Sequence, residues 1–324
     1  MTRPRDDGIV IGALEPGPRN TIADVGVTVG HVTVEQTGVT AVVPPGLPVP
    51  AGTAVLNGAG ELTGSLEIRE WGLLETPIYL TSTHAVGRVY DGAVAVAIAA
   101  DPRVGVDEVV IPVVGECDDS WLSDARVAHV QAGDVARAVV GATADFEQGA
   151  VGAGAGMSCF GWKGGIGSSS RRAGAHVVGV LLLTNFGTKE QLRVDGVAVG
   201  RLLAEDEPER KTPRSSCIAV LATDAPLTPP QLERLARRAG LGLARTGSVA
   251  HHGSGEIFVA FATATDRSFP DRGLDPLFEA AVDATEEAVL CSLWAARDTC
   301  GREGRLVRAL PRERVLELYR GRGR

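Results

Sequence analysis

A short apolar run constrains the fold of this chain more than any other stretch. Residues 217–222, CIAVLA, carry no charged or hydroxyl side chain. A run of this length with β-branched members favours a strand that is buried on both faces. The preceding residues 204–214, AEDEPERKTPR, are rich in charge and contain proline, which is typical of an exposed linker. Ser215 and Ser216 therefore lie where a linker meets an interior strand.

Two interpretations of these serines follow from their position. A hydroxyl at the mouth of a buried strand, beside a segment that could be cut, has the geometry that a hydrolase with an N-terminal nucleophile requires. The other interpretation is an ordinary junction between loop and strand, in which serine serves as a turn residue. The residues around Ser215 and Ser216 leave both interpretations open.

Composition argues against several partners and compartments. The chain has 324 residues, enough for one large α/β domain or two smaller ones. Its net charge of −8 and the lack of a long basic block argue against nucleic acid. No apolar run has the length of a signal peptide core or a membrane span, so we expect a cytoplasmic protein without a membrane partner. The five cysteines show neither disulfide nor zinc spacing, and we expect no metal and no cofactor.

Hydrophobic periodicity predicts a mixed α/β chain. An aromatic content of only 4% with 41 glycines indicates close packing of small residues. Predicted strands are 26–34 and 38–44 as a hairpin, one at the start of 53–64, one from 108 to 115, one from 176 to Asn185, 217–222, and one within 245–265 with Ser254 and Glu256 at its entry. One predicted helix starts at Thr63 as possible cap, and another is capped by Ser82 and Thr83 and runs to residue 100. The others are 129–140, 226–240, 275–296 and 311–319. In the helix 226–240, Thr228 is the cap and Gly240 ends the helix.

Several polar residues stand at predicted strand ends, where rigidly placed loops often carry sites. Glu116, Asp118 and Asp119 follow a buried strand and suit either a positively charged amine or solvent. Asn185 suits either an oxyanion donor or a turn. A further pair, Asn57 and Glu61, could be functional or could satisfy turn backbone. The glycine-rich stretch 149–172 lacks the Gly-Lys-Ser/Thr ending of a phosphate loop, and we interpret it as closely packed backbone or cleft lining.

Long stretches of the chain resemble the L-aminopeptidase/D-esterase and β-peptidyl aminopeptidase family of serine N-terminal nucleophile hydrolases. The stretches are PGPRNTIADV, VGHVTV, LNGAGELTG, GAGMSCFGWKGGIGSSSR, LTNFG, AVLATDAPLTPPQLERLARRAGLGLARTGS and GSGEIFVAFAT. The resemblance implies an α/β (α+β) fold, a four-layer αββα sandwich of two packed sheets flanked by helices, as a single domain over 1–324. It also implies self-cleavage between Ser215 and Ser216 into chains 1–215 and 216–324.

The resemblance assigns catalytic roles to four residues. Ser216 matches the nucleophile, and its α-amine, freed by the cut, would act as the general base, with a pKa of about 7.7–8. Ser215 is the alternative nucleophile, because the family usually has Asn or Gly before the reactive serine. Ser254 and Glu256 match the pair that orients the nucleophile. Asn185 matches the amide donor to the oxyanion.

One loop departs from the family pattern. The family usually reads Glu-Thr-Tyr-Asp where this chain has residues 116–119, ECDD. Glu116 matches and is the candidate for binding the substrate's ammonium group. Asp118 takes the place of a tyrosine whose hydroxyl donates to the oxyanion, and a carboxylate cannot donate unless it is protonated. The departure predicts another donor, or a weakened or redirected activity.

The expected function is a self-processing serine aminopeptidase that releases N-terminal residues from short peptides, amides or esters with a free amino group. One alternative is an acyltransferase related to the ornithine acetyltransferases, although these use threonine rather than serine. The other is an unprocessed, inactive scaffold or binding member of the family. The resemblance also implies a homo-oligomer, a tetramer or octamer of cleaved pairs.

Overall fold

The computed structural model describes residues 2–203, 215–264 and 269–321, and two sheets dominate this part of the chain. The linker predicted for 204–214 lies outside the described residues. The first sheet has the order β1 (Thr28–Val34), β2 (Thr37–Val43), β5 (Ile78–Ser82) and β6 (Val113–Cys117). The second has the order β4 (Leu73–Leu74), β3 (Val49–Gly58), β12 (Gly255–Ala262), β11 (Ser216–Thr223), β10 (His176–Asn185) and β9 (Ile166–Ala173).

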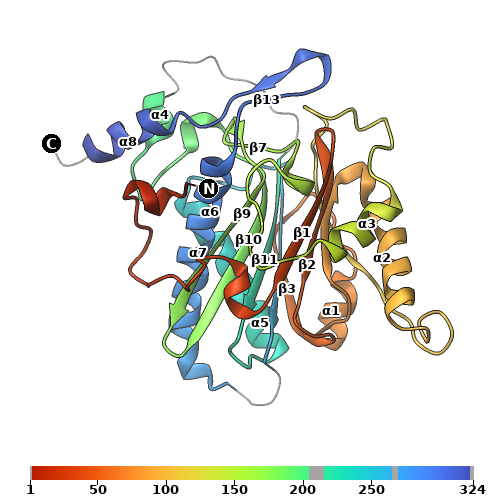
Figure 1. The fold of residues 1–324 in the computed structure, drawn as a ribbon. Helices are drawn as coiled ribbons and strands as arrows, with labels where there is room; N and C mark the ends of the chain where they lie inside the picture. The colour runs from red at the N-terminus through yellow and green to blue at the C-terminus, as the bar shows by residue number, and fades with distance from the viewer. Residues whose placement is uncertain (1, 204–214, 265–268, 322–324) are drawn as a thin grey trace.

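Helices cover the outer faces of both sheets (Figure 1). The first sheet packs against α2 (Val86–Ala100) and α3 (Ala132–Val140). The second packs against α5 (Pro229–Ala236), α6 (Arg238–Arg245) and α7 (Leu274–Ala295). The remaining α-helices and short ladders are α1 (Ser65–Trp71), α4 (Val199–Leu203), α8 (Arg312–Arg320), β7 (Ser158–Cys159) with β8 (Trp162–Lys163), and β13 (Thr299–Cys300) with β14 (Leu306–Val307).

Three buried hydrophobic clusters separate these elements into four layers. One lies between the first sheet and its helices and includes Val89 and Val135. A second lies between the two sheets and joins Leu80 to Val220. The third lies between the second sheet and its helices and includes Leu221 and Leu290. The protein is therefore an αββα sandwich, as the family resemblance implies.

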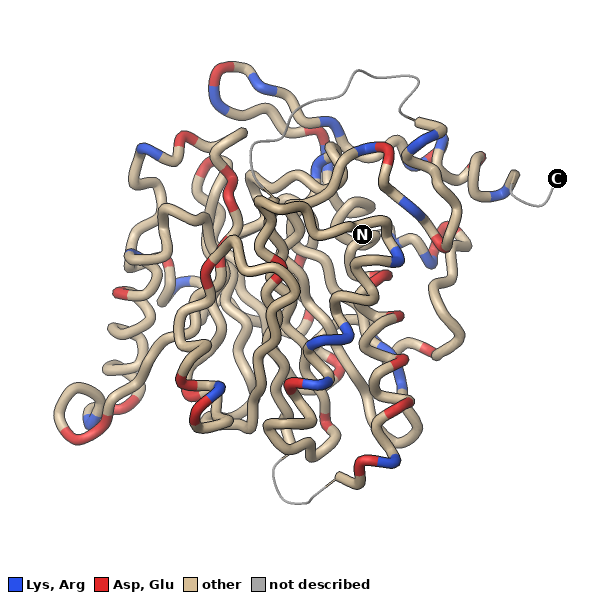
Figure 2. Tube along the Cα trace, turned by 180° about the vertical axis from the view of Figure 1, so that it is seen from behind, with Lys and Arg blue, Asp and Glu red and all other residues tan. Residues whose placement is uncertain are grey.

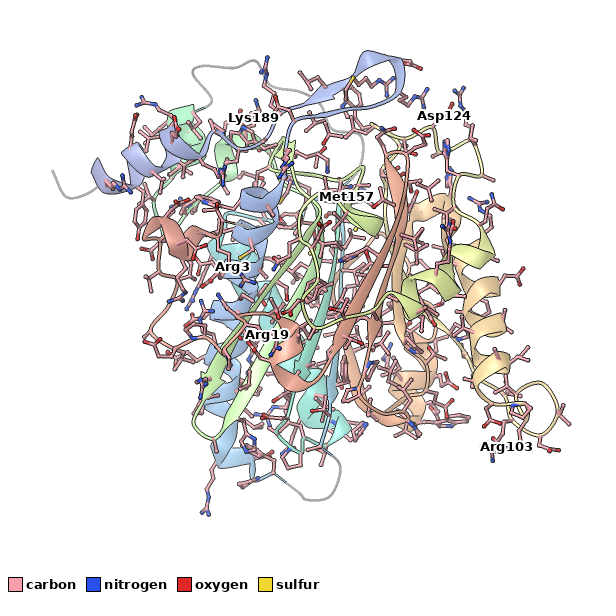
Figure 3. The ribbon with its side chains drawn as sticks, viewed as in Figure 1. Arg3, Arg19, Arg103, Asp124, Met157 and Lys189 are labelled. Carbon is pink, nitrogen blue, oxygen red and sulfur yellow. The ribbon has the colours of Figure 1, made fainter. Side chains whose placement is uncertain are left out.

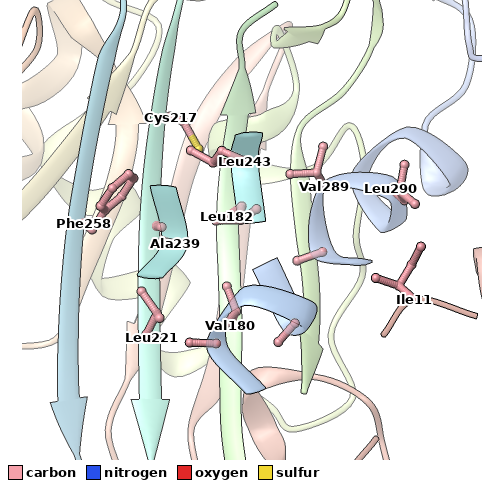
Figure 4. Packing of buried hydrophobic residues seen from close by; sticks show 14 of the residues in the cluster. Ile11, Val180, Leu182, Cys217, Leu221, Ala239, Leu243, Phe258, Val289 and Leu290 are labelled. Atoms are coloured by element: carbon pink, nitrogen blue, oxygen red, sulfur yellow. The ribbon is translucent and has the colours of Figure 1, made fainter. Parts of the chain in front are cut away.

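Strand β11 is the interior strand that the apolar run predicts. Every residue of it is buried, and it pairs antiparallel with β10 and parallel with β12. Ile218 faces the cluster between the sheets, while Cys217 and Leu221 face the helices (Figure 4). The two faces of a strand alternate, so both faces of β11 must be apolar for it to fit between two layers.

Glycines allow the layers to approach closely. A Cβ atom at Gly167 of β9 would lie 1.9 Å from the carbonyl oxygen of Ala288 in α7. At Gly165, whose φ is +138°, a Cβ atom would lie 2.0 Å from the carbonyl oxygen of Gly149. The prediction that the glycine-rich stretch is closely packed backbone is confirmed at these positions.

Three predicted helix boundaries are wrong. At two of them a predicted capping side chain has a tertiary partner instead, and at the third the chain bends. Gly64, not Thr63, caps α1, and the Thr63 hydroxyl donates to the carbonyl of Pro112 at 2.6 Å. α2 begins at Val86, because Ser82 and Thr83 bond carboxylates instead of capping the helix. α5 ends at Ala236, and residue 240 lies inside α6. The predicted hairpin of β1 and β2, and the helices α7 and α8, are confirmed.

Charged residues lie mainly on helices and loops, with both signs interspersed (Figure 2). Among the described residues, none of the helices combines the length and the apolar character that a membrane span requires.

Candidate active site

Strand register brings the predicted catalytic residues to one end of the second sheet. Ser216 begins β11 and lies opposite Asn185, the last residue of β10, on one side. On its other side it lies opposite Gly255, which stands between Ser254 and Glu256 at the start of β12. Neighbouring strands are about 4.8 Å apart, so these residues form a row across three strands.

The Ser216 hydroxyl contacts the peptide group that precedes it. Its Oγ donates to the carbonyl oxygen of Ser215 at 2.7 Å. The backbone N–H of Gly255 donates to the same oxygen at 3.2 Å. The Ser216 hydroxyl therefore lies beside the carbonyl group of Ser215, and a backbone N–H is directed at the oxygen of that carbonyl.

Ser254 and Glu256 form a buried pair next to Ser216. Ser254 Oγ donates to Glu256 Oε1, and both residues are fully buried. Burial raises the pKa of Glu256, and its Oε2 has no hydrogen-bond partner among the described residues. Asn57 Nδ2 donates to the carbonyls of Ser254 at 2.6 Å and His251 at 2.9 Å, so this amide fixes the loop that leads into β12. Of the two interpretations of Asn57, the structure supports the one in which it satisfies backbone groups.

The Asn185 amide is held from both sides. Its Oδ1 accepts the N–H of Ser158 at 3.0 Å, and its Nδ2 donates to the carbonyl of Asp118 at 2.8 Å. The residue is buried at the end of β10. The amide therefore links the glycine-rich segment to the loop that follows β6.

Glu116 lies within strand β6 rather than after the end of the strand as predicted, and its burial excludes the interpretation of a solvated side chain. The β6 strand packs directly on β11, because a Cβ atom at Gly115 would lie 3.0 Å from Ile218 Cγ2. Glu116 Oε1 accepts the N–H of Glu61 at 3.0 Å, and Oε2 accepts the hydroxyl of Thr83. Burial raises the pKa of Glu116, although these two bonds oppose the rise. Glu61 thus contributes its backbone to the site.

The side chain of Asp118 caps a turn. Its Oδ1 accepts the N–H of Ser120 at 2.9 Å, while its carbonyl accepts from Asn185. Asp119 next to it is buried and accepts from the Ser82 hydroxyl at 2.8 Å, and burial raises its pKa to about 6. The two hydroxyl residues that the sequence suggested as helix caps, Ser82 and Thr83, therefore serve the carboxylates of this site. In the sequence, these two residues stand just before an apolar helix, and nothing in that position indicates that they bond carboxylates.

One residue near the site was not singled out in the sequence. Lys163, in the glycine-rich segment, is fully buried. The sequence feature that could have indicated its burial is a single lysine among glycines and apolar residues. His31, in β1, has a structural role, because its ring nitrogens bond the Thr40 hydroxyl and the carbonyl of Glu147. Within the described ranges, no group of three or more His, Cys, Asp or Glu side chains could hold a metal ion.

A sandwich of this kind, with a nucleophile candidate opening a central strand, has the fold of the N-terminal nucleophile hydrolases. The chain belongs to peptidase family S58, whose model matches residues 20–307. Its membership places the chain among peptidases and therefore among hydrolases.

Relatives of known sequence and structure agree with this membership. The β-peptidyl aminopeptidase BapA of Sphingosinicella microcystinivorans is 38% identical over an alignment of 371 positions, which covers 98% of this chain and 92% of the relative. A solved β-aminopeptidase of a Burkholderia species is 41% identical, with a TM-score of 0.94 and coverage of 100% and 99% of the two chains. The L-aminopeptidase D-Ala-esterase/amidase of Ochrobactrum anthropi is 34% identical, with a TM-score of 0.92 and coverage of 100% and 99%.

Proposed function

We propose that this protein is a self-processing serine aminopeptidase that releases N-terminal residues from short peptides, amides or esters. The observation that carries the proposal is the contact of the Ser216 hydroxyl with the Ser215 carbonyl, whose oxygen also accepts the N–H of Gly255. The names of the relatives, β-peptidyl aminopeptidase and L-aminopeptidase D-Ala-esterase/amidase, support this substrate class.

Self-cleavage proceeds through an ester. Ser216 Oγ bonds to the Ser215 carbonyl carbon and loses its proton, and the C–N bond between the two residues breaks as the proton passes to the leaving nitrogen. Water then hydrolyses the ester, which leaves a carboxylate on Ser215 and a free α-amine on Ser216. The Gly255 N–H stabilises the negative charge that develops on the carbonyl oxygen.

After the cut, the same hydroxyl attacks the substrate. The Ser216 α-amine accepts the hydroxyl proton and returns it to the leaving group. The pair Ser254 and Glu256 orients this hydroxyl and amine, and Asn185 donates to the oxyanion. Glu116 binds the substrate's ammonium group. We further propose that the cleaved pairs assemble into a cytoplasmic homo-oligomer.

Denaturing gel electrophoresis tests the proposal. The intact chain of 33.6 kDa gives fragments of about 22 and 11 kDa when it is cut after residue 215. N-terminal sequencing of the smaller fragment should read Ser-Cys-Ile. A reading of Ser-Ser-Cys would assign the nucleophile to Ser215.

Two variants complete the test. Ser216→Ala should give one band and no peptidase activity, whereas Ser215→Gly, which keeps the nucleophile, should still be cut. A single band with full activity in the parent protein would refute self-processing. A single band without activity would favour the scaffold alternative, and transfer of the acyl group to an amino acid acceptor in preference to water would favour the acyltransferase.

A further inference from the structure

We propose that Lys163 is a positioning residue that orients and polarises the Asn185 amide for oxyanion binding. This inference rests on the proposed function. It is carried by a chain of hydrogen bonds that begins at a fully buried ammonium group and ends at the amide beside Ser216.

The Lys163 ammonium uses its three donors on main-chain carbonyls. Nζ lies 2.7 Å from the oxygen of Met157, 2.9 Å from that of Gly164 and 3.0 Å from that of Gly154. No ion pair of this lysine is found within the described residues. Burying a cation is costly, so a lysine used only to fill space would be replaced by an apolar side chain at lower cost.

The first of these carbonyls belongs to the peptide group that holds Asn185. The Met157 carbonyl and the Ser158 N–H are the two ends of one planar peptide unit. Lys163 donates to the oxygen end, and the nitrogen end donates to Asn185 Oδ1 at 3.0 Å. Hydrogen bonds in such a chain polarise one another, so a cation at one end strengthens the donors further along. The Asn185 Nδ2 donors stand at the far end.

A tight hairpin fixes the lysine relative to this peptide. Ser158 of β7 and Lys163 of β8 are cross-strand partners. The turn between the strands has positive φ at Phe160 (50°) and Gly161 (72°), as in a two-residue hairpin turn. Met157, labelled in Figure 3, lies near the upper end of the sheets in that view. The hairpin therefore places the ammonium group and Asn185 on opposite ends of one peptide.

The charge around Lys163 agrees with this role. Burial lowers the pKa of Lys163 to about 7, while the nearby Asp119 and Cys159 oppose the decrease. Only the ammonium form of lysine has three N–H donors, so the three carbonyl contacts match the charged side chain and would not all persist in the neutral amine. The effect of Lys163 on Asn185 is therefore expected to come from position and polarisation together.

A double-mutant cycle on the full-length, self-processed enzyme tests the inference. Lys163→Met keeps an unbranched side chain that is one heavy atom shorter but removes charge and donors, and Lys163→Gln keeps an amide donor. Each is combined with Asn185→Ala, and kcat is normalised to the cleaved fraction on a denaturing gel. Lys163→Met should lower kcat about tenfold or more with KM nearly unchanged, and Lys163→Gln should fall between Met and the parent. In the Asn185→Ala background, Lys163→Met should cost less than about threefold.

The outcomes separate this inference from the proposed function. If Asn185→Ala lowers kcat but the effect of Lys163→Met adds to it in full, the lysine does not act through Asn185 and the inference is wrong. If Asn185→Ala leaves kcat unchanged in an active enzyme, the oxyanion role in the proposed function is wrong as well. If both lysine variants fail to fold or to be cut while Asn185→Ala is normal, the lysine only holds the glycine-rich segment, which also overturns the inference.

Discussion

Glu116 illustrates how the environment of one side chain decides its role. In the sequence it is one of three acidic residues near a strand end. In the structure its two oxygens accept from the Glu61 N–H and the Thr83 hydroxyl, deep against the second sheet. A buried carboxylate that is already hydrogen-bonded needs only an ammonium group to balance its charge. The proposed substrate supplies one.

We therefore expect Glu116→Gln to raise KM for peptides with a free N-terminus about tenfold or more, since a charge-assisted bond would become neutral. Steady-state kinetics on a short peptide measures the change. Glu61→Gln is the matched control, because its backbone N–H, which contacts Glu116, is retained. Equal KM values for the parent and Glu116→Gln would remove the ammonium-binding role.

Helix α2 shows that glycines of one element can have opposite consequences for stability. Gly92 faces α3, and a Cβ atom there would lie 2.3 Å from the carbonyl oxygen of Ala132 and 2.6 Å from Val135 Cγ2. Gly87 lies on the same helix with no atom within 4 Å of the Cβ position. The first glycine permits contact between two helices, and the second only weakens the helix.

This difference gives a matched prediction. Gly92→Ala should lower the free energy of unfolding by about 1–3 kcal/mol, because α3 must shift to avoid the new methyl group. Gly87→Ala should raise it by a few tenths of a kcal/mol through helix propensity, because Gly87 lies in the first turn of α2. Urea unfolding followed by circular dichroism measures both. Two changes of the same sign would contradict the close approach of α2 and α3.

At the scale of the whole molecule, a buried ion network ties the N-terminal segment to the second sheet and α7. Glu287 of α7 accepts from Arg171 of β9, from Arg5 at 3.0 Å and from the Asn20 amide. Burial alone would raise the pKa of Glu287, but the two arginines bring it below its ordinary value. The carboxylate therefore stays ionised between two cations.

We expect Glu287→Gln to lower the free energy of unfolding by about 3–5 kcal/mol near neutral pH, since it leaves buried cations without a counter-charge. A carboxylate whose pKa is lower in the folded than in the unfolded state stabilises the fold at pH values above its unfolded pKa of about 4.3. This stabilisation is lost as the pH falls through the pKa of the folded state. The difference between parent and variant should therefore shrink below about pH 4. Urea titrations at several pH values measure it, with Glu279→Gln, an exposed change on the same helix, as control. A constant difference down to acid pH would refute the ionised network.

Much of the fold was predictable because its signals are local. The run 217–222 predicts a doubly buried strand, and β11 has that form. The pattern after residue 274 predicts a long helix, and α7 spans Leu274–Ala295. The start of α2 was not predictable, because the hydroxyls of Ser82 and Thr83 bond carboxylates of a strand and loop distant in sequence.

Local patterns of apolar residues, glycine and proline predicted β1, β2, β3, β6, β10, β11 and β12, the main helices and the position of Ser216 at a strand entrance, because burial and turn chemistry depend on near neighbours in the chain. They did not predict β5 or β9. The pairing of β10, β11 and β12 is long-range, and it alone brings Asn185, Ser216 and Glu256 into one row. The same holds for Lys163, whose partnership with the Asn185 amide arises only when the glycine-rich hairpin packs on the sheet.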